Sequence, residues 1–151
     1  MKFSAQARTR ARRYAMQALY QRDLSGLDMV EIQRQFFEAE DFTNADGGYF
    51  IDLLNGVNTR IERIDSRLSE TIDRPIGQLD PVERAILRMA CYELLFRHDI
   101  PYRVIINEAV SLARKFGAEQ GHAFVNGVLD NVARKIRPTE SSGIDKQVTG
   151  S

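Results

Sequence analysis

Arginine side chains cluster near the start of the chain, and this cluster is the clearest chemical feature of the sequence. The first 22 residues, MKFSAQARTRARRYAMQALYQR, contain six lysines and arginines and no acidic residue. Four of these are Arg8, Arg10, Arg12 and Arg13. Guanidinium groups without nearby carboxylates attract phosphate, whereas arginines at a helix N-terminus oppose the helix dipole. The pattern therefore favours nucleic-acid binding, with RNA as the ligand, over a purely structural helix start.

A second candidate surface lies in the segment GHAFVNG, residues 121–127. Phe124 either packs into the core or offers its ring as a platform on which an unpaired base stacks. Asn126 either reads a base edge or caps the turn. Spacing alone favours the structural alternative for both residues.

Residue types suited to catalysis or metal binding are present but are not grouped. The glycine segments NADGGY and GAEQG lack the lysine or the preceding strand that a nucleotide-binding loop needs. His98 and His122 stand apart, and Cys91 lies in an apolar run where a small buried side chain is its expected role. We therefore expect no enzyme activity, no metal and no cofactor.

Charge is unevenly distributed, although the formal net charge is zero. Residues 23–52 contain eight acids and one base, Arg34, whereas residues 97–137 contain seven bases and four acids. This division suits an anionic ligand on the basic patches and a basic protein partner on the acidic ones. No run approaches the ~20 apolar residues that cross a bilayer, and no secretory signal is apparent. A single cysteine fits a reducing, cytoplasmic setting.

Helical periodicity runs through almost the whole chain and predicts an all-α fold of about seven helices. The first apolar stripe consists of Ala7, Ala11, Tyr14, Ala15, Ala18 and Leu19. Because the arginines flank this stripe, we expect them to face solvent while the helix stays docked. A heptad-like seam from Phe50 to Ile72 predicts one long helix, with Gly56 at a close helix–helix approach.

The second half of the chain carries the clearest helix boundaries. Asp80 is expected to cap a helix over 81–97, with Glu83 completing a capping box. This helix is apolar nearly all round, which predicts the buried centre of the fold. Helices over about 101–117 and 121–136 follow. Residues 1–138 are expected to form one domain, and the polar segment 139–151 is expected to be a disordered tail.

Five segments together resemble the bacterial transcription antitermination factor family NusB. They are ARRYAMQALYQ, DLLNGV, LDPVERAILRMACYELLFR, DIPYRVIINEAVSLARKFG and FVNGVLDNVARKIRP, and they span residues 8–138. The resemblance implies two small packed helical bundles that bind the boxA element of nascent ribosomal-RNA leaders, together with NusE, a ribosomal small-subunit protein. It further implies assembly with NusA, NusG and RNA polymerase, and suppression of premature, Rho-dependent termination without catalysis or cofactor. Without NusE, a homodimer is an expected state.

The resemblance also assigns roles to individual residues. With the two surfaces above, the expected RNA-binding set is Lys2, Arg8, Arg10, Arg12, Arg13, Arg88, Phe124 and Asn126. Tyr20 and Glu83 match positions that face NusE, although capping would compete for the Glu83 carboxylate. Gln120 and Ala123 stand where the family often has an acid and a lysine, and these two changes affect RNA affinity with opposite signs.

Two other classes of function remain open. NusB-like domains also occur as RNA-engaging accessory domains fused to RNA cytosine methyltransferases, although this chain is short for a cofactor-binding half. A purely protein-binding scaffold would use the acidic segment 23–52 and a homodimer face. A helix-turn-helix DNA-binding protein is disfavoured because no basic recognition helix follows a tight turn.

Overall fold

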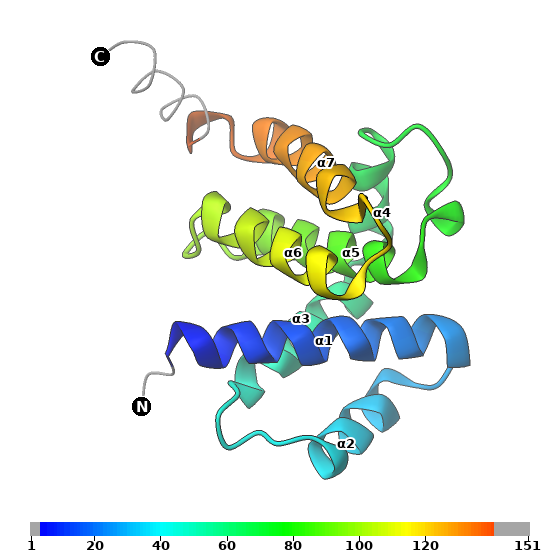
Figure 1. The fold of residues 1–151 in the computed structure, drawn as a ribbon, viewed down its shortest axis with the longest axis vertical. Coiled ribbons are helices and arrows are strands. Elements are labelled where there is room, and N and C mark those ends of the chain that lie inside the picture. Colours follow the sequence, from blue (N-terminus) through cyan, green and yellow to red (C-terminus); the bar gives the residue numbers. More distant parts are fainter. Residues whose placement is uncertain (1–3, 141–151) are drawn as a thin grey trace.

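The computed structural model describes residues 4–140, which fold into helices joined by short loops (Figure 1). The helices are α1 (Ala5–Ser25), α2 (Met29–Ala39), α3 (Gly47–Thr59), α4 (Ile61–Ser69), the short 3₁₀ helix η1 (Ile76–Gln78), α5 (Pro81–Phe96), α6 (Tyr102–Phe116) and α7 (Gly121–Ile136). No β-strand occurs between residues 4 and 140, so the all-α prediction is confirmed. Lys2 and residues 141–151 lie outside the described part of the chain.

The helices form two bundles that share the central helix α5. In Figure 1, α1, α2 and α3 form the lower bundle, and α4, α6 and α7 gather around α5 in the upper one. Eleven of the 16 residues of α5 are buried, which confirms its predicted central position. Because α1 packs against both α3 and α5, it joins the two bundles.

The small residues of α1 explain how closely it docks. Ala11, Ala15 and Ala18 are completely buried, and all six members of the predicted stripe lie in the core. Ser4 caps the helix by accepting a hydrogen bond from the backbone N–H of Ala7 at 3.1 Å. Gly26 ends it in the left-handed conformation, with φ of 71°.

The seam from Phe50 to Ile72 is not one helix, and this prediction was wrong. The backbone leaves helical geometry at Arg60, with φ −118° and ψ 23°, which separates α3 from α4. The Thr59 hydroxyl donates to the Asn55 carbonyl at 2.8 Å, a contact that bends helices. Both halves still bury their seam residues, because periodicity identifies the buried face and not the continuity of the backbone.

Gly56 lies where α3 crosses α5, as predicted. A Cβ atom at this position would lie 2.2 Å from the ring of Tyr92. The Tyr92 hydroxyl donates to Asp52 at 2.8 Å, which holds the ring against the glycine.

The ordered chain extends beyond the predicted boundary at residue 138. Glu140 accepts a hydrogen bond from the backbone N–H of Tyr102 at 2.9 Å, in the first turn of α6. Arg137 is 6% exposed and donates to the carbonyl oxygens of Leu94 at 3.0 Å and Ile100 at 2.6 Å. Residues 139 and 140, placed in the tail by the prediction, are therefore held by the fold, because Glu140 satisfies an orphan N–H of α6. The rest of the predicted tail lies outside the described residues.

Candidate nucleic-acid interface

The four arginines of α1 do not share one environment. Arg10 is exposed and Arg13 is half-buried, whereas Arg12 is only 3% exposed. Arg8 lies between these extremes, with 36% of its side chain exposed. The expectation that all four face solvent is therefore wrong for Arg12.

Arg12 is held inside the protein by Glu93 of α5. Its Nε and Nη2 atoms donate to Oε2 of Glu93 at 3.0 and 2.9 Å, and the Tyr49 hydroxyl also donates to that carboxylate. Burial disfavours the Arg12 charge, but the Glu93 carboxylate outweighs it, so the pKa of Arg12 lies above its ordinary value. Arg12 is thus a structural cation, and the prediction that it binds RNA is corrected.

Arg8 and Arg10 keep part of their donor capacity. The Arg8 guanidinium lies 4.5 Å from the centre of the Tyr49 ring, and its Nε is 3.8 Å from Asp46. Arg10 donates from Nη1 to the Asn44 carbonyl at 3.1 Å while its side chain remains exposed. A guanidinium carries five N–H donors, so both groups retain donors for a phosphate.

Helix α6 adds a lysine to this side of α1. Arg10 and Arg13 line a cleft of about 50 Å³ with Thr9, Glu108, Ser111, Leu112 and Lys115. The Glu108 carboxylate in this cleft accepts a hydrogen bond from the Thr9 hydroxyl at 2.7 Å. Lys115 and Arg13 make no hydrogen bond or ion pair within residues 4–140, and the Arg13 guanidinium lies 5.2 Å from the centre of the Tyr14 ring. We call the side chains of Arg10, Arg13 and Lys115 the α1–α6 basic surface. The sequence did not single out Lys115, since only the docking of α6 beside α1 places it there.

Arg88 lies elsewhere and is paired with two carboxylates. It donates to both carboxylate oxygens of Asp65 at 2.9 Å and to Asp23 at 3.0 Å, and its side chain is 14% exposed. Asp23 is ten residues beyond Arg13 on α1, or about 15 Å along the helix axis. Arg88 therefore ties α5 to α1 and α4, and its expected role in RNA binding stays a prediction.

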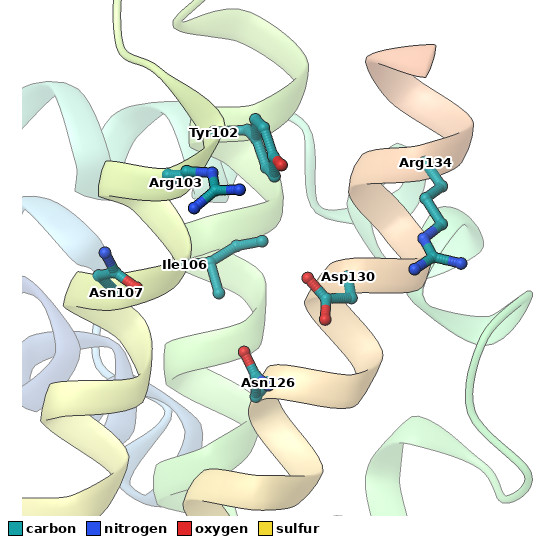
Figure 2. Close-up of a pocket in the computed structure, with 7 residues that line it drawn as sticks. All are labelled: Tyr102, Arg103, Ile106, Asn107, Asn126, Asp130 and Arg134. Carbon is teal, nitrogen blue, oxygen red and sulfur yellow. The ribbon is translucent and has the colours of Figure 1, made fainter. Parts of the chain in front are cut away.

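Phe124 and Asn126 point to different sides of α7, because two residues on a helix are rotated by about 200°. Phe124 is half-buried against the core, and the Arg74 guanidinium lies 4.8 Å from its ring centre. Asn126 is exposed and forms no capping hydrogen bond, so the capping alternative is excluded. Its side chain instead lines a groove between α6 and α7 (Figure 2).

Of the two partner-facing candidates, only Tyr20 is accessible. Tyr20 lines an apolar groove of about 350 Å³ with Leu24 and Phe36, and Leu24 is 61% exposed. An apolar, open groove of this kind suits a protein partner.

Glu83, in contrast, is 6% exposed and lies beneath the loop between α6 and α7. A Cβ on Gly121 would lie 2.9 Å from its carboxylate, and Glu83 accepts a hydrogen bond from the Ala118 backbone. Burial, and then the charge of Asp80, raise the pKa of Glu83. Asp80 does cap α5, through Val82 N–H at 3.4 Å, but Glu83 makes no capping-box hydrogen bond to the Asp80 backbone within residues 4–140. Its expected contact with NusE stays a prediction.

The remaining candidates for chemistry lie apart or are buried. Cys91 is completely buried, as predicted, and burial raises the pKa of its thiol to about 12. Between residues 4 and 140, no three His, Cys, Asp or Glu side chains are grouped as metal ligands would be. No helix in that range is long and apolar enough to span a membrane.

The fold and the α1–α6 basic surface define a small all-helical protein with a basic face. Residues 9–134 match the model of the NusB family. A curated "Transcription antitermination protein NusB" from Nitrosococcus oceani is 50% identical over 133 residues, which cover 88% of this chain and 89% of that protein. The chain belongs to the NusB family.

Solved structures agree with this assignment. NusB of T. maritima is 34% identical with a TM-score of 0.75, over 89% of this chain and 93% of that one. A chain of the crystal structure of antitermination factors NusB and NusE in complex with dsRNA is 28% identical with a TM-score of 0.78, over 87% and 99% of the two chains. These comparisons support the antitermination interpretation and give no support to the accessory-domain or scaffold alternatives.

Proposed function

We propose that this chain is a transcription antitermination factor that binds boxA-type single-stranded RNA of nascent ribosomal-RNA leaders together with NusE. The observation that carries the proposal is the α1–α6 basic surface, whose Arg13 and Lys115 have no carboxylate partner in the described chain. Its occurrence in a family whose curated members are named transcription antitermination proteins supports RNA as the anion.

The RNA contacts in this proposal are Arg8, Arg10, Arg13 and Lys115, with Phe124 as a stacking platform. Removal of Arg74 from the Phe124 ring would open the face on which a base can stack. Lys2 remains a proposed contact that lies outside the described residues.

The protein partner in this proposal is NusE, seated on the apolar groove beside Tyr20. Leu24, 61% exposed, and the partly exposed Tyr20 give that groove apolar area for a partner to cover. The pair would act in the cytoplasm with NusA, NusG and RNA polymerase to suppress Rho-dependent termination, as a regulator rather than an enzyme and without a cofactor. A homodimer would form only in the absence of NusE.

A salt-titrated RNA-binding measurement tests the proposal. Four cations on a single strand predict a slope of log affinity against log salt of about −3. Replacing Arg10, Arg13 and Lys115 together by alanine should reduce the slope to about −1 and weaken binding both with and without NusE. Arg63→Ala, which removes an exposed cation on α4, is the matched control and should leave the slope unchanged. An unchanged affinity in the triple variant would refute the RNA surface.

A further inference from the structure

The groove between α6 and α7 that Asn126 lines is separate from the α1–α6 basic surface. Its volume is about 280 Å³, and its walls are formed by facing side chains of the two antiparallel helices (Figure 2). Arg103 on α6 and Arg134 on α7 lie towards one end of the groove, and Asn107 and Asn126 lie towards the other. Asp130 projects between the two ends from α7.

Tyr102 gives the groove a polar atom that the protein itself does not use. The residue is 8% exposed, and its hydroxyl is directed toward α7 in Figure 2. This hydroxyl makes no hydrogen bond within residues 4–140, yet it is not sealed off, since no side-chain polar atom there is both fully buried and unpaired. Buried hydroxyls ordinarily have a partner, so the hydroxyl is poised for a ligand or ordered water. Ile106, 5% exposed, supplies an apolar wall beside it.

The charged groups of the groove are also unpaired. Arg103, Asp130 and Arg134 form no ion pair or hydrogen bond with any residue from 4 to 140. Elsewhere in the structure, arginines close to carboxylates are engaged, as Arg88 is with Asp65. The groove therefore offers two cations, one acceptor-only carboxylate and two amides that both donate and accept.

We propose that this groove holds one unpaired nucleotide of the bound RNA strand. The proposal rests on the proposed RNA function and extends it to a base-reading site. Arg103 and Arg134 contact the flanking phosphates, and the amides of Asn107 and Asn126 contact the base edge.

Asp130 gives this site a base preference. A carboxylate only accepts hydrogen bonds, so Asp130 favours bases that carry an exocyclic amino group, such as cytosine, and disfavours uracil, which presents carbonyl oxygens. A charged peptide side chain is a poorer match. A cationic side chain would face Arg103 and Arg134, and an anionic one would face Asp130.

The exposed face of α6 connects the groove with the α1–α6 basic surface. Asn107 and Lys115 are both exposed on this helix and lie eight residues apart, or about 12 Å along its axis. A single strand that lies on Lys115 can therefore reach the groove without leaving α6.

Anisotropy titrations with labelled C-only and U-only RNA strands of about 12 nucleotides test the base preference. The wild-type chain should bind the C strand about tenfold more tightly than the U strand. Asp130→Asn should reduce this ratio to about twofold or less, whereas Tyr102→Phe should weaken binding of both strands and keep the ratio. Loss of the Asp130 charge should strengthen binding of both strands equally, so the ratio of the two affinities is unaffected by this gain. Glu62→Gln, which neutralises an exposed acid on α4, should retain the tenfold ratio.

A nuclear magnetic resonance titration with CMP separates failure of the groove from failure of the RNA function. CMP should shift the side-chain amide signals of Asn107 and Asn126 more than UMP does. Shifts confined to other residues, or equal C and U affinities in the wild type, would overturn the groove site. Absence of strand binding together with CMP shifts at these amides would refute the RNA function while leaving a nucleotide site in place.

Discussion

Arg12 and Arg13 are neighbours on α1, and their surroundings are opposite. Arg12 lies on the inner side of the helix, 3% exposed and paired with Glu93, whereas Arg13 lies on the outer side beside Lys115. The difference shows that the number of charged residues in a segment does not give the number of contacts with a ligand. What decides the role of each guanidinium is whether a distant part of the chain supplies a carboxylate.

Removal of Arg12 is the strongest test of this comparison. Arg12→Ala should lower the free energy of unfolding by about 3–5 kcal/mol, because Glu93 is left charged and buried without its partner. Urea denaturation measures the loss. Arg13→Ala, the matched outer variant, should stay within about 0.5 kcal/mol of the wild type.

If Arg12→Ala does not fold, the double variant Arg12→Met with Glu93→Leu still tests whether the unpaired Glu93 charge is the cause. Replacing both members of a buried pair by apolar residues should recover most of the lost stability. If Arg12→Ala instead remained stable and lowered the RNA salt slope, Arg12 would belong to the outer surface.

Arg88 is a second arginine that is paired inside the protein, and it lies near the opposite end of α1 through its contact with Asp23. Arg88→Ala should lower the free energy of unfolding by about 1–3 kcal/mol, since Asp65 and Asp23 lose their shared cation in a partly buried setting. The RNA salt slope should not change. A slope reduced by about 0.7, with stability retained, would support Arg88 as a phosphate contact.

The features predicted correctly from the sequence depend on neighbours within about one helical turn. The alanine stripe of α1 and the Asp80 cap are examples, since periodicity and capping are read from residues three or four apart. The pairing of Arg12 with Glu93 spans 81 residues and has no local signal. For the same reason, Lys115 emerged as a surface residue only once α6 was placed beside α1.

The two buried glutamates differ in the same way as the two arginines. Glu93 is paired with the cation of Arg12, whereas Glu83 lies near the like charge of Asp80 and accepts a hydrogen bond from a backbone N–H. A folded-state pKa raised above the ordinary value means that ionisation of Glu83 weakens the fold as pH rises above that ordinary value. Glu83→Gln should therefore stabilise the protein at neutral pH and have little effect in acid, where Glu83 is protonated in both states. Thermal unfolding at several pH values checks this. A gain that is equal at all pH values would show that ionisation is not its cause.

Arg8 is neither fully paired inside the protein, as Arg12 is, nor free of a carboxylate, as Arg13 is. Its substitution should have small effects on both stability and the RNA salt slope. It is one-third exposed, it lies over the Tyr49 ring, and its distance of 3.8 Å from Asp46 makes a weak ion pair. Arg8→Ala should cost less than about 1 kcal/mol of stability and reduce the RNA salt slope by less than about 0.7. Arg8→Lys separates the two parts, because a lysine keeps the charge for phosphate but loses the planar stacking on Tyr49. If Arg8→Lys keeps the salt slope but loses the small gain in stability, Arg8 lies between the inner and outer sides of α1. If Arg8→Ala changes the slope as much as Arg13→Ala does, Arg8 belongs to the outer side.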